Sequence, residues 1–286
     1  MLYNTLGAYE KALTAKQKAL LIFKSMFGPI HAVTAFATNS LAETYLAMGQ
    51  YNKALALLTI SSSVLENVPV ELRIDKNLAV TNLGIAYLKL KKLDKAESIF
   101  RIVLTDTLKK YPAYHPFVAY SKMNLAEAYV EGEKYNKAAE LAMDALAIAK
   151  SKRSPYLLVH SYFILARIRQ AQKRTLEAIF YGKQAINKLQ TIRSGLASTE
   201  KSLQKAFISS QQNNYEVLAG WLINVGRLSE AEQVLAMLKE NEYFNFIRRA
   251  KRQDPRVTLS NLNALESLQK KKLELFNAIR AVINEK

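Results

Sequence analysis

The segment TAFATNSLAETYLAMGQYNKALALL, residues 34–58, contains the pattern that decides the fold. Its portion MGQYNKAL returns in related form as LGAYEKAL, LKKLDKAE and GEKYNKAA. Each version contains an alanine, and these alanines recur every 42 residues: Ala12, Ala54, Ala96 and Ala138. A tyrosine stands nine residues before each of them: Tyr3, Tyr45, Tyr87 and Tyr129. A fixed period with fixed small and aromatic positions is typical of a solenoid, in which each repeat packs on its neighbours.

Each repeat is predicted to be a hairpin of two amphipathic helices. Residues 35–48 place Ala42 and Tyr45 on one helical face, and residues 51–66 place apolar side chains at spacings of three, four or seven. Between them, Gly49 can adopt the left-handed conformation that ends a helix sharply. Prolines fall between repeats, where a lost backbone donor does no harm: Pro29, Pro69, Pro112 and Pro155. We therefore expect an all-α chain whose repeated alanines lie where paired helices approach closely.

The order of these residues resembles the tetratricopeptide repeat. A leucine followed by alanine or glycine comes first, then the tyrosine, then the alanine nine residues later: Leu41-Ala42, Leu83-Gly84 and Leu125-Ala126 begin three such runs. The 42-residue period and the segment FGPIHAVTAFATNSLAETYLAMGQYNKAL make the array similar to the kinesin-light-chain type of repeat. The resemblance implies a right-handed superhelical solenoid of antiparallel helical hairpins over residues 1–193. After an incomplete first hairpin, the repeats are expected near 35–76, 77–118, 119–158 and 159–193.

Both ends of the array depart from the period. Counting back 42 residues places Met1 in the middle of a first helix, so we expect that preceding residues are missing. Ala178 follows Ala138 by 40 residues, with Arg169 at the tyrosine position, and Ala231 follows after another 53. Residues 194–252 are predicted to form a long helix, a last hairpin and an exit helix.

Residues 253–286 are predicted to be a linker and a C-terminal amphipathic helix. Asp254-Pro255 should stop the preceding helix, and Ser260-Asn261 should cap the next. Its apolar stripe comprises Leu265, Leu268, Leu275, Phe276, Ile279, Val282 and Ile283. We expect this stripe to pack back on the array, with an absent domain or another chain as the alternative.

A second resemblance covers residues 226–249, GRLSEAEQVLAMLKENEYFNFIRR. This segment resembles the last tetratricopeptide hairpin and exit helix that precede the protease domain of bacterial CHAT proteins, which are caspase-like. The matching residues are Gly226, Arg227, Glu230, Ala231, Val234, Leu235, Leu238, Lys239, Glu242, Phe244, Phe246, Arg248 and Arg249. The resemblance implies a sensor region for an adjoining or separate protease domain. No histidine or cysteine follows residue 250, so the catalytic part is lacking, and a free-standing scaffold or adaptor is the alternative.

The sequence offers no enzyme chemistry. With no cysteine in the chain, disulfides and thiolate sites are excluded. His31 and His115 lie 84 residues apart, twice the period, so both should have a structural role just before a helix. No catalytic triad or phosphate-binding glycine loop is recognisable. We therefore expect no catalytic residue, cofactor or metal. The N-terminus lacks the features of a signal peptide, and the longest uncharged helical run, residues 154–166, is too short for a membrane span. A cytoplasmic protein without a membrane partner is therefore expected.

By the tetratricopeptide resemblance, the inner positions of the first helices form a partner-binding groove. These positions are Asn39, Glu43, Leu46, Thr81, Ile85, Tyr120, Met123, Glu127, Phe163, Arg167 and Gln170. The groove lacks a repeated lysine and asparagine clamp for a terminal carboxylate, so an internal segment of a protein or a peptide is the expected partner.

The net charge of +17 is concentrated between Lys150 and Arg193, where ten basic residues accompany one acid, Glu177. A basic patch is expected from Arg167, Arg169, Lys173, Arg174 and Lys183. It is a solvated face, a surface for an acidic protein, or a nucleic-acid surface, the last being least favoured because aromatic stacking residues are few there.

Overall fold

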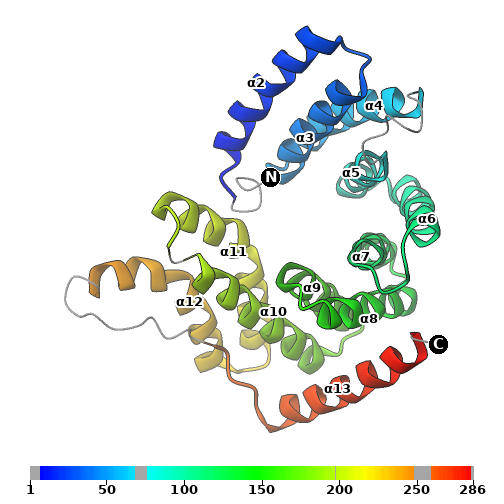
Figure 1. Cartoon of the computed structure of the whole chain (residues 1–286). Helices are drawn as coiled ribbons and strands as arrows, with labels where there is room; N and C mark the ends of the chain where they lie inside the picture. The colour runs from blue at the N-terminus through cyan, green and yellow to red at the C-terminus, as the bar shows by residue number, and fades with distance from the viewer. Residues whose placement is uncertain (1–6, 68–75, 197, 248–258, 285–286) are drawn as a thin grey trace. The chain divides into compact units, whose positions relative to one another are not determined.

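The computed structural model describes residues 7–67, 76–196, 198–247 and 259–284, with the side chains of residues 76, 239–247 and 275–284 left out. Helix is the only regular secondary structure in these ranges, which confirms the all-α prediction. The helices follow one another along the chain as hairpins (Figure 1). Their bounds are α2 Tyr9–Phe27, α3 Ala32–Ala47, α4 Tyr51–Asn67, α5 Lys76–Lys89, α6 Leu93–Lys110, α7 Pro116–Glu131, α8 Tyr135–Ser151, α9 Pro155–Ala171, α10 Thr175–Gly195, α11 Lys201–Asn224, α12 Leu228–Ile247 and α13 Ala264–Asn284. Tyr3, Pro69 and Asp254-Pro255, which the sequence analysis uses, lie outside the described residues.

The chain divides into two compact units. Unit 1 contains residues 1–112 and 124–134, and unit 2 contains residues 113–123 and 135–286. In unit 1, α3 packs on α4, α4 on α5, and α5 on α6. In unit 2, α8 packs on α9, α9 on α10, α10 on α11, and α11 on α12. Each unit therefore consists of helices that contact their neighbours in sequence.

Five hairpins turn through the same backbone conformation. The residue five positions before each repeated alanine has a positive φ: Gly49 75°, Lys91 59°, Glu133 59°, Lys173 59° and Gly226 74°. In each turn the next backbone N–H donates to the carbonyl five residues earlier, as from Gln50 to Tyr45 at 2.9 Å and from Arg227 to Leu222 at 2.9 Å. These bonds satisfy carbonyl groups that the helix end leaves open. The turn is therefore set by its place in the repeat, and glycine occupies it only in some repeats.

The repeated alanines are buried as the sequence predicts. Ala54, Ala96, Ala138 and Ala178 are fully buried. Gly84 lies on α5, the first helix of its hairpin, where that helix closely approaches α6. A Cβ added at Gly84 would lie 2.6 Å from the Phe100 ring of α6. A side chain larger than these cannot be accommodated without moving a helix.

The two periodic histidines cap helices. His31 Nδ1 accepts a hydrogen bond from the backbone N–H of Val33 at 3.2 Å, at the start of α3. His115 Nδ1 accepts one from Phe117 at 3.2 Å, at the start of α7. The predicted structural role of both is confirmed, because each satisfies a donor that the first helical turn leaves open.

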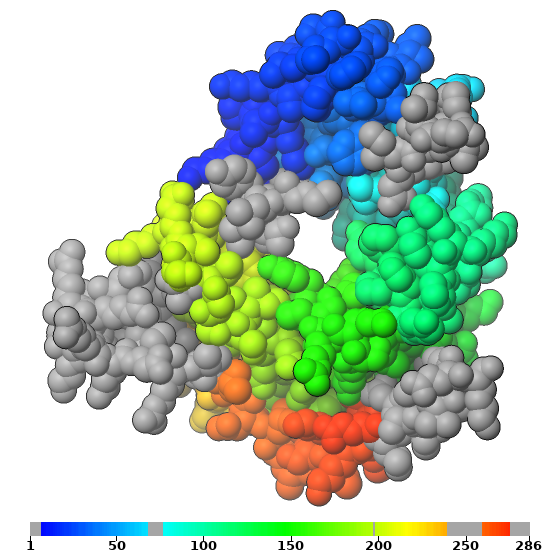
Figure 2. Space-filling model, viewed as in Figure 1, coloured from blue at the N-terminus to red at the C-terminus, as the bar shows by residue number. Residues whose placement is uncertain are grey.

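The last helix packs back on the repeats, as expected. Helix α13 contacts α10 and α8 within unit 2, and Figure 2 shows its described part in orange along the surface of that unit. The predicted stripe is wrong in its described part, because Leu265 is 52% exposed and Leu268 50% exposed. The buried contacts come from Glu266 and Leu273. The remaining stripe positions have no described side chains.

The start of α13 also differs from the prediction. The Asn263 side chain accepts a hydrogen bond from the Glu266 N–H at 2.9 Å, and the Glu266 carboxylate accepts one from the Asn263 N–H at 2.9 Å. This reciprocal arrangement is a capping box. Ser260-Asn261 is therefore not the cap, because these residues contact α10 instead.

Candidate functional site

In unit 1 the predicted groove residues divide between surface and interior. Glu43, Leu46, Ile85 and Glu127 are half-buried. The prediction that Asn39 and Thr81 line the groove is wrong, because both side chains are buried and add no exposed surface. Asn39 Oδ1 accepts a hydrogen bond from Asn82 Nδ2 at 3.1 Å, linking α3 to α5, and Thr81 donates to the Asn77 carbonyl at 2.6 Å.

In unit 2 the groove residues that reach the surface lie on α7 and α9. Tyr120, Phe163, Arg167 and Gln170 are half-buried. The prediction that Met123 lines the groove is also wrong. Its side chain is fully buried, and its sulfur accepts a hydrogen bond from Ser161 at 3.1 Å.

Three of these residues share one face of α9. Phe163, Arg167 and Gln170 stand at positions i, i+4 and i+7. Four of the α9 residues between them are buried, namely Ile164, Leu165, Ala166 and Ile168, and Arg169 is half-buried. We call Phe163, Arg167 and Gln170 the α9 face, and it presents an aromatic ring, a guanidinium and an amide.

The predicted basic patch does not form one exposed cationic surface. Arg169 and Arg174 both form ion pairs with Glu177, and the Arg169 pair measures 3.2 Å. Lys183 is fully buried, which removes it from the patch. Lys173 is exposed and Arg167 half-buried. The single acid in this part of the sequence thus pairs with two of the five residues predicted for the patch, which the linear charge count does not reveal.

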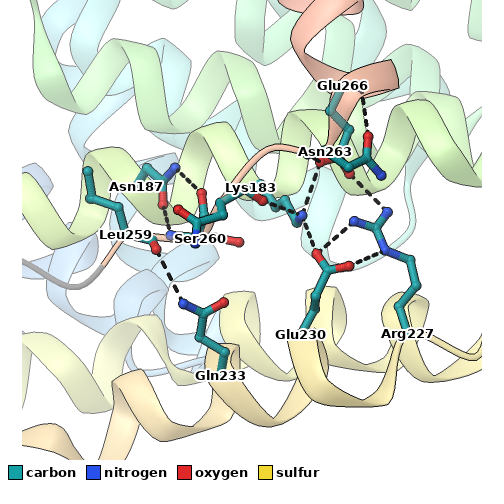
Figure 3. A network of polar contacts seen from close by, with 10 residues as sticks. Lys183, Asn187, Arg227, Glu230, Gln233, Leu259, Ser260, Asn263 and Glu266 are labelled. Atoms are coloured by element: carbon teal, nitrogen blue, oxygen red, sulfur yellow. Dashed lines mark hydrogen bonds and ion pairs between the residues drawn. The ribbon is translucent and has the colours of Figure 1, made fainter.

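Lys183 belongs instead to a buried network that joins α10, α12 and α13 (Figure 3). Its Nζ donates to a Glu266 carboxylate oxygen at 3.0 Å, to the Asn261 carbonyl at 2.7 Å and to Glu230. Arg227 Nη1 donates to the other Glu266 oxygen at 2.9 Å, and Arg227 also binds Glu230 through two nitrogens. Two cations therefore balance two carboxylates.

Polar contacts to the backbone extend this network along residues 259–263. The Asn187 amide accepts from the Ser260 N–H at 2.7 Å and donates to the Ser260 carbonyl at 3.0 Å (Figure 3). Gln233 donates to the Leu259 carbonyl at 3.4 Å. We call Lys183, Arg227, Glu230 and Glu266, with these contacts, the α13 latch, because they hold the entry to α13 against α10 and α12.

The latch perturbs two of its own ionisable groups. Burial acts to raise the pKa of Glu230, but hydrogen bonds from Arg227 and Lys183 outweigh it and hold that pKa below 4.5. Hydrogen bonding to Glu230 raises the pKa of Arg227. These pKa shifts favour the charged forms of Glu230 and Arg227, so the two side chains stabilise each other as an ion pair within the network.

The sequence contains only local signals for the latch. Arg227 and Glu230 are three residues apart, as are Asn263 and Glu266, and both spacings are visible in the chain. The pairing of Lys183 with Glu266, 83 residues away, has no such signal.

The described residues contain no group of three or more histidine, aspartate or glutamate side chains placed to hold a metal ion. Within the same ranges, no helix is both long enough and apolar enough to cross a lipid bilayer.

Comparison with known proteins places this architecture in a family. Residues 1–66 and 77–151 match a family model described as tetratricopeptide repeat. No curated protein matches the chain.

Three solved structures share the fold. BtubC (BKLC) from P. vanneervenii is 14% identical, with a TM-score of 0.54 over 92% of this chain and 98% of that one. A kinesin light chain protein of Podosopora anserina with nearly identical TPR-like repeats is 23% identical, with a TM-score of 0.51 over 66% of this chain and 91% of that one. The apo form of RapI is 16% identical, with a TM-score of 0.52 over 85% and 93%. The repeat pattern, the hairpins and the family match agree, and residues 1–66 and 77–151 belong to the tetratricopeptide repeat family.

Proposed function

We propose that this chain is a protein-interaction module that binds an internal segment of a partner protein through the first helices of its repeats. The α9 face carries this proposal, because Phe163, Arg167 and Gln170 stay at the surface of a helix whose other side is buried. Aromatic and arginine side chains are the residue types that contribute most to protein interfaces. Tetratricopeptide repeats imply this general role.

The chemistry of the α9 face indicates the kind of segment that fits it. Phe163 offers apolar surface, and Arg167 can bind a carboxylate through two parallel hydrogen bonds. An extended or helical segment with an apolar and an acidic residue would satisfy both.

A charge reversal with a matched control tests this function. Arg167→Glu should lose the partner, whereas Lys137→Glu, an equal charge change at an exposed position of α8, should retain it. Partners captured with the unaltered chain would be identified by mass spectrometry, and their affinities measured with purified proteins. Equal capture by both variants would show that the α9 face is not the binding surface.

We also propose that partner binding regulates a caspase-like protease of the CHAT class. The resemblance of residues 226–249 to the segment preceding that domain supports the proposal. Arg227 and Glu230 belong to this segment. Glu230 accepts hydrogen bonds from Lys183 of α10 and from Arg227, so a displacement of α10 would alter the contacts of this segment. Binding would then favour one of two arrangements of the predicted exit helix, residues 236–251, whose described part, residues 236–247, is the second half of α12.

The reading frames around this chain provide the test. A histidine and cysteine pair in a caspase-like domain, in the same frame or a neighbouring one, should be present. If it is present, replacing the exit helix in the full system should abolish the partner's effect on proteolysis. Absence of the domain, or regulation unchanged after replacement, would leave a free-standing adaptor as the function.

A further inference from the structure

Unit 2 contains a cavity of about 480 Å³ beside α13, separate from the α9 face and the latch. Its walls come from the end of α8, the α8–α9 turn, α9, α10 and α13. The volume lies within the range that small-molecule sites occupy in proteins.

The rim of the cavity is strongly cationic. Lys150, Arg153, Lys188 and Lys270 line it, against one carboxylate, Glu274. Within the described part of the chain, none of these four cations lies within ion-pair distance of a carboxylate, whereas both cations of the latch do. Burial lowers the pKa of Lys150 despite the opposing effect of Glu274, and nearby Lys270 and Lys188 lower it further. The folded protein therefore holds like charges together, which an anion would relieve.

The floor of the cavity is apolar and aromatic. Leu158, Tyr162, Phe180 and Leu273 line it, and all four are at least nine-tenths buried. Burial raises the pKa of Tyr162 to about 12, so its hydroxyl stays protonated near neutral pH and can donate a hydrogen bond. A bound molecule would meet rings and aliphatic carbon below and cations above.

We propose that this cavity binds a small organic anion, a carboxylate or phosphate carried on an apolar ring. Lys150, Arg153, Lys188 and Lys270 hold the anionic group, and Tyr162, Phe180 and Leu273 contact the ring. Because Lys270 and Leu273 belong to α13, the bound anion links this helix to the repeats. This is a small-molecule site, so it goes beyond the proposed protein-binding function and does not depend on it.

Calorimetric titration of the full chain with defined probes tests the site. Phenyl phosphate or benzoate should bind with one-to-one stoichiometry. The probe that binds more tightly identifies the preferred anionic group as phosphate or carboxylate. Inorganic phosphate and benzyl alcohol should each bind at least about tenfold more weakly than the better ring-bearing anion, because each lacks half of the recognised chemistry. No binding of either ring-bearing anion at about 1 mM, or equal affinity for inorganic phosphate, would overturn the proposal.

Single substitutions locate the binding. Lys188→Ala and Lys270→Ala should each weaken binding about tenfold or more, since each removes one charge-assisted contact. Lys271→Ala is the matched control, because Lys271 is an exposed neighbour outside the cavity lining. An equal loss in the control would refute the site.

A further variant should weaken binding without destabilising the fold. Gln184→Glu places a carboxylate inside the cationic lining, so it should raise the melting temperature while weakening anion binding about tenfold or more. Unchanged or tighter binding by this variant would contradict the proposal.

Discussion

Replacing Glu266 with glutamine should weaken the α13 latch more than any single surface change in unit 2. Glutamine keeps the shape of the side chain but removes the negative charge that faces Lys183 at 3.0 Å and Arg227 at 2.9 Å. The Lys183 side chain is 0% exposed and that of Glu266 3% exposed, so water cannot replace the lost charge.

The expected cost follows from what remains around Lys183. Removing one member of a buried ion pair costs about 3–5 kcal/mol when the other charge is left alone. Lys183 still contacts Glu230 and the Asn261 carbonyl, so we expect a smaller loss of about 2 kcal/mol. For a chain of this size, that corresponds to a fall of about 4–8 °C in melting temperature.

Urea unfolding and hydrogen exchange provide the measurement. The exchange protection of α13 amides should fall more than that of the hairpins, because the latch joins α13 to α10 and α12. Glu232→Gln is the matched control, since Glu232 is an exposed carboxylate on α12. Equal stability of the Glu266 and Glu232 variants would refute the reasoning.

A double-mutant cycle separates the ion pair from other effects of the substitution. In a Lys183→Met background, Glu266→Gln should lower the free energy of unfolding by less than it does in the unaltered chain. The reason is that no buried lysine then loses a carboxylate partner. The difference between the two costs should be about 1–2 kcal/mol, and a difference near zero would mean that Lys183 and Glu266 do not interact.

Three further predictions concern the repeats and the latch. Ala96→Leu should destabilise the fully buried approach of its hairpin by about 1–3 kcal/mol, and a thermal melt equal to the parent's would contradict the packing argument. Glu133→Gly should stabilise the chain by about 0.5–1 kcal/mol in urea unfolding, because Glu133 has a φ of 59° that glycine adopts without strain; a loss of stability would count against this. Glu230 has a pKa held below 4.5 by Arg227 and Lys183 although burial opposes this, so its stabilisation is present above about pH 4.5 and is lost as pH falls through the lowered value. The free energy of unfolding should therefore fall less steeply on acidification in Glu230→Gln than in the unaltered chain, and identical profiles would exclude this contribution.

Much of the fold could be predicted from the sequence because its signals are local. The turn before each repeated alanine and the two histidine caps depend on residues within a few positions of one another, and the 42-residue recurrence of the alanines repeats these local signals along the chain. Lys91 and Glu133 adopt the same turn as Gly49 without being glycine, which shows that the repeat context sets the backbone there.

The candidate site was less predictable. A pattern carried over from a family places Asn39, Thr81 and Met123 at inner positions, but these residues are buried against neighbouring side chains. The exposed part of the predicted groove, including the α9 face, depends on how closely adjacent helices pack, and helical spacing alone does not give that distance.

The sequence by itself determined the repeated hairpins, their turns and the absence of cysteine chemistry. Only the tertiary structure decided the role of Lys183, which composition assigns to a basic patch and packing places in a buried network with Glu266. The physical reason is that a charge acts according to its burial and its nearest opposite charge, and residues 83 positions apart become neighbours only through folding.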